Sequence, residues 1–149
     1  LQRLYWSGLL HDLGKIAIPD YILLKDGPLS KREFEEVKRH PAYGADLLAS
    51  LSSEFWQMAE VVRSHHERWD GLGYPQGLEG SAIPLMSRVI SIIDVFEALT
   101  SERPYRKPMS SEDALEFVLE AAGRQFDPTL VEIFERCLER GEILAASQQ

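Results

Sequence analysis

Two adjacent histidines, His65 and His66, run directly into a loop that is dense in acidic residues, glycine and proline. A second cluster, His11-Asp12-Leu13-Gly14-Lys15, stands upstream of this stretch. Imidazole and carboxylate groups are good ligands for transition metals, and a carboxylate can bridge two cations while an imidazole binds one. We therefore predict a metal site formed by both stretches, with the glycine-rich loop as its substrate-facing rim.

The surroundings of His11 and Asp12 strengthen this interpretation. Taken alone, the pair also fits a histidine and an aspartate on the surface at the end of a helix. The flanking residues are apolar, however, and an unpaired aspartate in such surroundings is costly. Lys15 follows one helical turn later, where its charge is suited to steadying a phosphate group.

Asp94 is a second carboxylate in an apolar setting, within the run Arg88-Val89-Ile90-Ser91-Ile92-Ile93-Asp94. A carboxylate inside so apolar a helix needs a cation. That cation is either a metal ion or the guanidinium of an arginine such as Arg88. Glu97 lies three residues on and is expected on the same face of the helix.

His40 is the remaining histidine, and the chain has four histidines in all. We expect it at the C-terminus of a helix, where the helix dipole alone would account for it. All four histidines nevertheless occupy predicted helix ends or helix–loop junctions. His65 and His66 lie about 100° apart on a helix, so both reach one site only if it sits over the helix end.

A compact cationic loop, Arg103 to Lys107, follows the segment that contains Asp94. It is either a solvated loop or a phosphate clamp, since arginine binds phosphate oxygens with a planar fork. Within a chain of net charge −8, this local positive charge favours an anionic ligand.

The elements that must position these residues are predicted to be helices, so the fold class is all-α and bundle-like. Ser30 and Glu33 form a capping box that opens a helix reaching His40. Further helices are predicted over 1–10, 43–51, 54–66, 84–100 and 114–122, and the last one begins at Asp127-Pro128. Segment 16–29 is predicted to be a loop with at most one helical turn, segment 67–83 is predicted to be a loop, and the tail from 140 to 149 is expected to be frayed.

Length and composition are typical of one globular domain of 149 residues. The acidic net charge argues against binding to a nucleic acid polymer. Cys137 is the only cysteine, so no disulfide forms within the chain, and a reducing cytoplasm is the expected location. No apolar run is long enough for a membrane span. The chain starts in what is predicted to be the middle of a helix, so we expect it to be a domain cut from a longer protein.

Taken together, these motifs resemble the HD-GYP family of metal-dependent phosphodiesterases, within the HD superfamily. His11-Asp12 with Gly14-Lys15 resembles the family's HDxGK, and His40 with Gly44 resembles its HxxxG. The HHE and GYP elements are matched by 65–67 and 73–75. Asp94, the segment 98–106 and Phe126-Asp127-Pro128 resemble its later elements, so the similarity covers about residues 4 to 136.

The resemblance implies hydrolysis of cyclic di-GMP to linear pGpG, and further to GMP in some cases, with two iron or manganese ions. Asp12 would bridge the two ions and, with Lys15, is the expected catalytic residue. The implied ligands of one metal are His40, His65 and His66, and those of the other are His11 and Asp94. Lys15, Arg103 and Arg106 would bind phosphate, and Gly73 and Tyr74 would shape the rim that meets guanine.

The family also has a metal-binding histidine on a helix upstream of the His-Asp pair, which this N-terminally truncated chain is expected to lack. We therefore expect one tight metal site and one loose one. Two alternatives stay open: an HD phosphohydrolase acting on another nucleotide, and a non-catalytic module that contacts a diguanylate cyclase domain. The resemblance leaves open an N-terminal sensory or receiver domain, a homodimer, the identity of the metal and the final product.

Overall fold

The computed structural model of the chain describes residues 1–102 and 107–143. These residues form eight α-helices: α1 Gln2–Leu10, α2 Asp20–Leu23, α3 Lys31–Val37, α4 His40–Leu51, α5 Trp56–Arg63, α6 Leu85–Thr100, α7 Ser111–Glu120 and α8 Pro128–Glu139. Three short 3-10 helices, η1 Leu13–Ala17, η2 Ser53–Phe55 and η3 Gly80–Ala82, lie between them. Apart from two isolated bridges, the described residues contain no strand, which confirms the all-α prediction.

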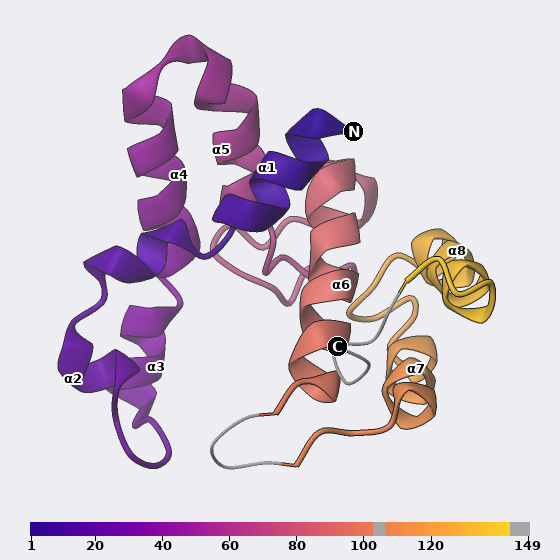
Figure 1. Cartoon of the computed structure of the whole chain (residues 1–149). Coiled ribbons are helices and arrows are strands. Elements are labelled where there is room, and N and C mark those ends of the chain that lie inside the picture. Colours follow the sequence, from indigo (N-terminus) through magenta and orange to yellow (C-terminus); the bar gives the residue numbers. More distant parts are fainter. Residues whose placement is uncertain (103–106, 144–149) are drawn as a thin grey trace.

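The first half of the chain is built around an antiparallel pair of helices, α4 and α5, joined through η2 (Figure 1). η1 packs on α4, and α1 packs on α5. The core between them is aliphatic and consists of Ala45, Leu48, Ala59 and Val62. Gly14 of η1 lies so close to α4 that a Cβ atom there would overlap the His40 carbonyl group. The approach of η1 to α4 therefore requires glycine at this position.

The second half places α6, α7 and α8 around a separate core. This core is larger and partly aromatic, with Ile92, Phe96, Val118, Phe126 and Phe134 among its members. The packing of α6 connects the two halves, because α6 contacts α1 and α5 as well as α7 and α8.

One ion pair joins α6 to the start of α8. The Arg88 guanidinium donates to Asp127 Oδ2 at 2.6 Å, and Asp127 Oδ1 accepts from the backbone N–H of Thr129 at 2.9 Å. Asp127 thus caps α8 as predicted, and Pro128 occupies the first turn. Arg88, which the sequence offered as an alternative partner for Asp94, is therefore paired with Asp127 instead.

The predicted caps are confirmed, and some helix boundaries differ. Ser30 and Glu33 form the capping box at the start of α3. That helix ends at Val37, however, and His40 is the first residue of α4, because Pro41 suits a first helical turn. The prediction that His40 ends a helix is therefore wrong. The dipole at a helix C-terminus consequently does not explain the position of His40. The single helical turn allowed within the loop 16–29 is α2, Asp20–Leu23.

Two predicted segments fall partly or wholly outside the described residues: the cationic residues Arg103 and Arg106, and most of the frayed tail, of which 144–149 are not described. Within the described part of the chain, no helix combines the length and apolar character needed to span a membrane.

Candidate functional site

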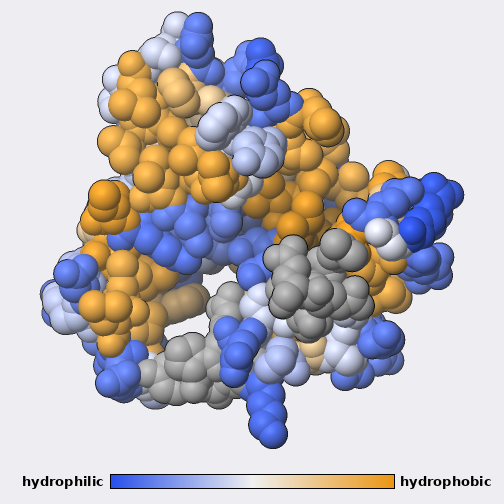
Figure 2. All heavy atoms as spheres, in the orientation of Figure 1, coloured by the Kyte–Doolittle hydropathy of each residue, from blue (hydrophilic) through white to orange (hydrophobic). Residues whose placement is uncertain are grey.

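Residues from four parts of the chain meet where α1 ends, α4 begins, α5 ends and the middle of α6 passes (Figure 1). On this face of the molecule, a hydrophilic band runs between two apolar regions (Figure 2). All six metal ligands predicted from the sequence lie within the described residues: His11, Asp12, His40, His65, His66 and Asp94.

Three of the histidines are oriented in the same way. In each, the ring Nδ1 lies against the backbone carbonyl oxygen three residues earlier: His11 on Gly8 at 2.6 Å, His40 on Val37 at 2.8 Å, and His65 on Val62 at 2.6 Å. A carbonyl oxygen only accepts, so Nδ1 carries the hydrogen and donates it. In the neutral ring, Nε2 then holds the free lone pair, which is the arrangement of metal-binding histidines.

The Nε2 atoms converge on the Asp12 carboxylate. His40 Nε2 lies 3.2 Å from Asp12 Oδ1, and His11 Nε2 lies 3.4 Å from Asp12 Oδ2. His40 Nε2 is also 3.3 Å from His65 Nε2. Two nitrogen lone pairs at this distance repel unless a cation is shared between them. Nitrogens that bind one ion at about 2.1 Å lie about 3 to 3.4 Å apart, so the donor set fits a metal ion.

The ligand atoms form two overlapping groups, each within 4.8 Å: His40 with His65 and His66, and His11 with Asp12 and His65. Burial lowers the pKa of His65 to about 3 and that of His66 to about 4, and neighbouring imidazoles add to the effect. Both rings are therefore unprotonated at neutral pH, which is the form that binds metal.

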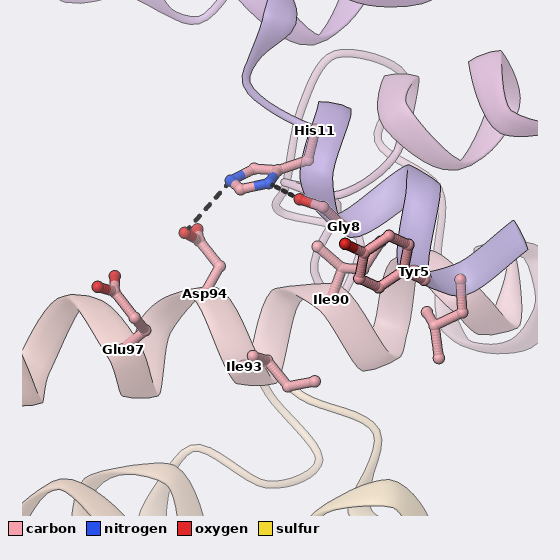
Figure 3. Close-up of a pocket in the computed structure, with 8 residues that line it drawn as sticks. Tyr5, Gly8, His11, Ile90, Ile93, Asp94 and Glu97 are labelled. Atoms are coloured by element: carbon pink, nitrogen blue, oxygen red, sulfur yellow. Dashed lines mark hydrogen bonds and ion pairs between the residues drawn. The ribbon is translucent and has the colours of Figure 1, made fainter. Parts of the chain in front are cut away.

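His11 has the opposite electrostatic setting, because its Nε2 lies between two carboxylates. Asp94 Oδ1 lies 3.6 Å from it, on the side of α6 (Figure 3). Hydrogen bonds to Asp12, and then to Asp94, raise the pKa of His11 to about 10. Burial alone would raise the pKa of Asp94, but the contact with His11 holds it below its usual value. The partner of Asp94 among the described residues is thus a histidine of the site and not Arg88.

A cavity of about 350 Å³ opens beside His11 and Asp94, between α1 and α6. Its walls are mainly apolar and include Tyr5, Ile90 and Ile93 (Figure 3). Glu97 lines the same cavity, which confirms the prediction that it shares a face of α6 with Asp94.

Lys15 lies at the open side of the site. Its ammonium group donates to Asp12 Oδ2 at 2.5 Å, and both side chains are partly exposed. Burial by itself would raise the pKa of Asp12, but the contacts with His11, His40 and Lys15 hold it far below its usual value. Asp12 therefore stays ionised and is contacted from three sides.

The glycine-rich loop lies directly beside the histidines. The Tyr74 ring packs on the His66 ring, with centroids 5.0 Å apart and planes at 34°. Burial, and then the charges of Asp94 and Asp12, raise the pKa of Tyr74 to about 12. A Cβ atom on Gly73 would overlap the backbone of Glu67 and its neighbour, so this glycine serves close packing of the loop.

Glu67 is a residue whose role sequence reasoning missed. Its side chain is buried and accepts from the backbone N–H groups of Gln76 at 2.6 Å and Leu78 at 3.0 Å. The available signal was a charged residue that directly follows a histidine pair and precedes a glycine-rich loop.

The chain is similar to several known proteins. A model of the HD domain family matches residues 1–130. The chain is 43% identical to a cyclic di-GMP phosphodiesterase of Vibrio cholerae, over 98% of this chain and 31% of that protein. It is 47% identical to the cyclic di-GMP phosphodiesterase response regulator RpfG of Xanthomonas campestris, over 85% of this chain and 34% of that protein.

A solved structure shares the fold. It is the crystal structure of a cyclic GMP-AMP-specific phosphodiesterase of Vibrio cholerae, with a TM-score of 0.70 and 25% identity, covering 94% of this chain and 38% of that one. The chain thus spans about a third of the length of these relatives. The resemblance indicated by the motifs is confirmed, and the chain belongs to the HD domain family.

Proposed function

We propose that this chain is one HD-GYP domain, over residues 1–149, that hydrolyses cyclic di-GMP to linear pGpG with the help of two divalent metal ions. The observation that carries the proposal is the shared orientation of His11, His40 and His65. The Nε2 atoms of His11 and His40 lie beside Asp12, and that of His65 lies beside that of His40. The names of two relatives supply the substrate.

In this proposal Asp12 contributes to both metal positions. His40, His65 and His66 complete one position, and His11 with Asp94 contribute to the other. Mixed imidazole and carboxylate ligands suit iron or manganese. When bound, two such cations supply an activated water at neutral pH and polarise the phosphoryl oxygens.

The remaining residues bind and orient the substrate. Lys15 lies beside Asp12 at the open side of the site, where its ammonium group can steady a phosphate oxygen. Tyr74 offers an aromatic ring at the rim, and Gly73 lets the loop that carries it pack closely. Arg103 and Arg106, proposed from the sequence alone, would add guanidinium donors to the second phosphate.

A second substrate, cyclic GMP-AMP, is supported by the solved structure that shares this fold. Both cyclic dinucleotides carry two phosphodiesters and differ only in that one guanine of cyclic di-GMP is adenine in cyclic GMP-AMP, so the same metal positions serve either. We assign cyclic di-GMP as the substrate and keep the other as the competing candidate. A diguanylate cyclase domain and an attached receiver domain are proposed partners, the latter because one relative is a response regulator. A cytoplasmic location and a homodimer are proposed with them.

The test is a direct comparison of the two substrates. Protein saturated with manganese is incubated with each cyclic dinucleotide, and the products are separated by chromatography. We expect linear pGpG from cyclic di-GMP, at a higher kcat/KM than for cyclic GMP-AMP. A higher kcat/KM for cyclic GMP-AMP would reverse the substrate assignment, and hydrolysis of neither would leave the non-catalytic module as the better account.

A further inference from the structure

His66 differs from the other histidines of the site in how its ring is held. His11, His40 and His65 each donate a ring hydrogen bond to a backbone carbonyl group. No ring nitrogen of His66 makes a hydrogen bond with another of the described residues. Metal-binding histidines depend on such contacts to fix the direction of the ring. Another contact must therefore orient His66.

Aromatic packing is the contact available to this ring. The Tyr74 ring lies at 34° to it with centroids 5.0 Å apart, and the His65 ring lies 4.1 Å away on the same measure. Tyr74 is itself confined, because the Lys38 ammonium group lies 5.6 Å from the centre of its ring. The His40 ring also contacts the His66 ring, with centroids 5.1 Å apart, but His40 and His65 are each fixed by their own backbone hydrogen bond. Tyr74 is therefore the neighbouring ring whose position the loop decides.

Glu67 fixes the position of the loop that contains Tyr74. The residue is only 4% exposed, and its carboxylate accepts from the N–H groups of Gln76 and Leu78, which follow Tyr74 in the loop. In addition, the N–H of Tyr74 donates to the His66 carbonyl oxygen at 3.2 Å. Hydrogen bonds from amides to a buried carboxylate are strong and short. The loop is therefore fastened at Tyr74 and just after it.

The chemistry of this contact requires a carboxylate. Both loop groups are donors, so the side chain between them must offer two acceptors. Glutamine has the same shape but replaces one oxygen with an NH₂ group, which would face an N–H donor. Replacing Glu67 with glutamine therefore breaks one of the two hydrogen bonds with little change in volume.

We propose that Glu67 is a positioning residue for metal binding: it fixes the loop so that the Tyr74 ring orients His66 toward the metal. The inference rests on the proposed metal site and is independent of the proposed substrate. In this proposal Glu67, the glutamate of the HHE element, supports the preceding histidine, His66. It does so indirectly, by holding the loop that carries Tyr74.

The test is manganese binding to the purified protein, measured by calorimetry without substrate. Glu67→Gln and Tyr74→Ala should each weaken the metal position that contains His66 by about 10- to 100-fold, as loss of a ligand's supporting contact commonly does. Tyr74→Phe keeps the ring and should bind as the wild type does. Glu60→Gln, a matched change at an exposed position of α5, is the control.

The double variant Glu67→Gln/Tyr74→Ala separates positioning from general loosening of the site. If both residues act through His66, the manganese affinity of the double variant should equal that of the single variant with the lower affinity. The proposal would be overturned if the fold losses of manganese affinity in the two single variants multiplied in the double variant. It would also be overturned if a folded Glu67→Gln protein bound manganese as the wild type does. If Glu67→Gln does not fold, the pair Tyr74→Ala and Tyr74→Phe decides, and equal binding by these two would also overturn it.

Failure of the proposed function gives a different result. If the wild-type protein binds manganese but does not hydrolyse cyclic di-GMP, the proposed function fails and the role of Glu67 in metal binding is unaffected. Wild-type protein that binds no manganese would remove both.

Discussion

The two proposed metal positions should respond differently to pH, because their histidines hold protons differently. The carboxylates beside His11 raise its pKa to about 10, so this ring is protonated throughout the neutral range. Burial lowers the pKa values of His65 and His66 to about 3 and about 4, so both rings are neutral in that range. A metal ion that binds at His11 must displace a proton, whereas one that binds at His65 and His66 releases none from those rings.

The size of the effect follows from this difference. Below the pKa of His11, displacing one proton makes the apparent affinity about tenfold higher for each pH unit. Between pH 6 and pH 8, manganese affinity at the His11 position should therefore rise about 100-fold. Affinity at the position of His65 and His66 should change much less. The sequence predicted one tight and one loose metal site, and the proton held by His11 gives a physical reason for the difference.

The assay is manganese titration at pH 6, 7 and 8, followed by the electron paramagnetic resonance signal of the free ion. Two classes of site should separate most widely at pH 6 and approach each other at pH 8. The tighter position serves as the internal control for any effect of pH on folding. Parallel pH dependence at both positions would refute the reasoning, since it would mean that His11 does not hold its proton against the metal.

Four substitutions test other parts of the site and its surroundings. His66→Ala should remove at least one metal by elemental analysis, and retention of two would contradict its assignment as a ligand. Lys15→Ala and Arg103→Ala should lower turnover, on the order of 100-fold for a lost charged donor, with metal content unchanged at saturating manganese. Loss of metal in either would show that phosphate binding is the wrong role. Gly14→Ala, whose Cβ would overlap the His40 carbonyl, should lower the free energy of unfolding by about 1 to 3 kcal/mol or more in urea titration.

The local features of the fold were readable in the sequence because they depend on neighbouring residues. The capping box of Ser30 and Glu33 is formed within one turn, and so is the cap that Asp127 places on α8. The boundary at His40 was wrong because two helices meet there. Helical spacing alone does not separate the end of one helix from the start of the next, and Pro41 is the only local signal of the break.

Contacts between distant residues were beyond the reach of sequence patterns. Asp94 had two plausible cations, and the choice depended on Arg88 reaching Asp127, which lies 39 positions later in the chain. Glu67 looked like one residue of a motif, yet its carboxylate binds amides of the returning loop. The ligand set was recognisable because its residue types are rare in apolar surroundings, while the supporting contacts use backbone groups that every residue carries.

The measurement that tests the central claim most directly is the manganese content of wild-type protein and Asp12→Asn, compared with the turnover of cyclic di-GMP by each. Asp12 is the residue proposed to serve both metal positions, and it contacts His11, His40 and Lys15 in this structure. At saturating manganese we predict two ions per wild-type chain, with hydrolysis to linear pGpG. Asp12→Asn should lose at least one ion and the hydrolysis with it. A folded Asp12→Asn protein that keeps two ions and full turnover would contradict the account.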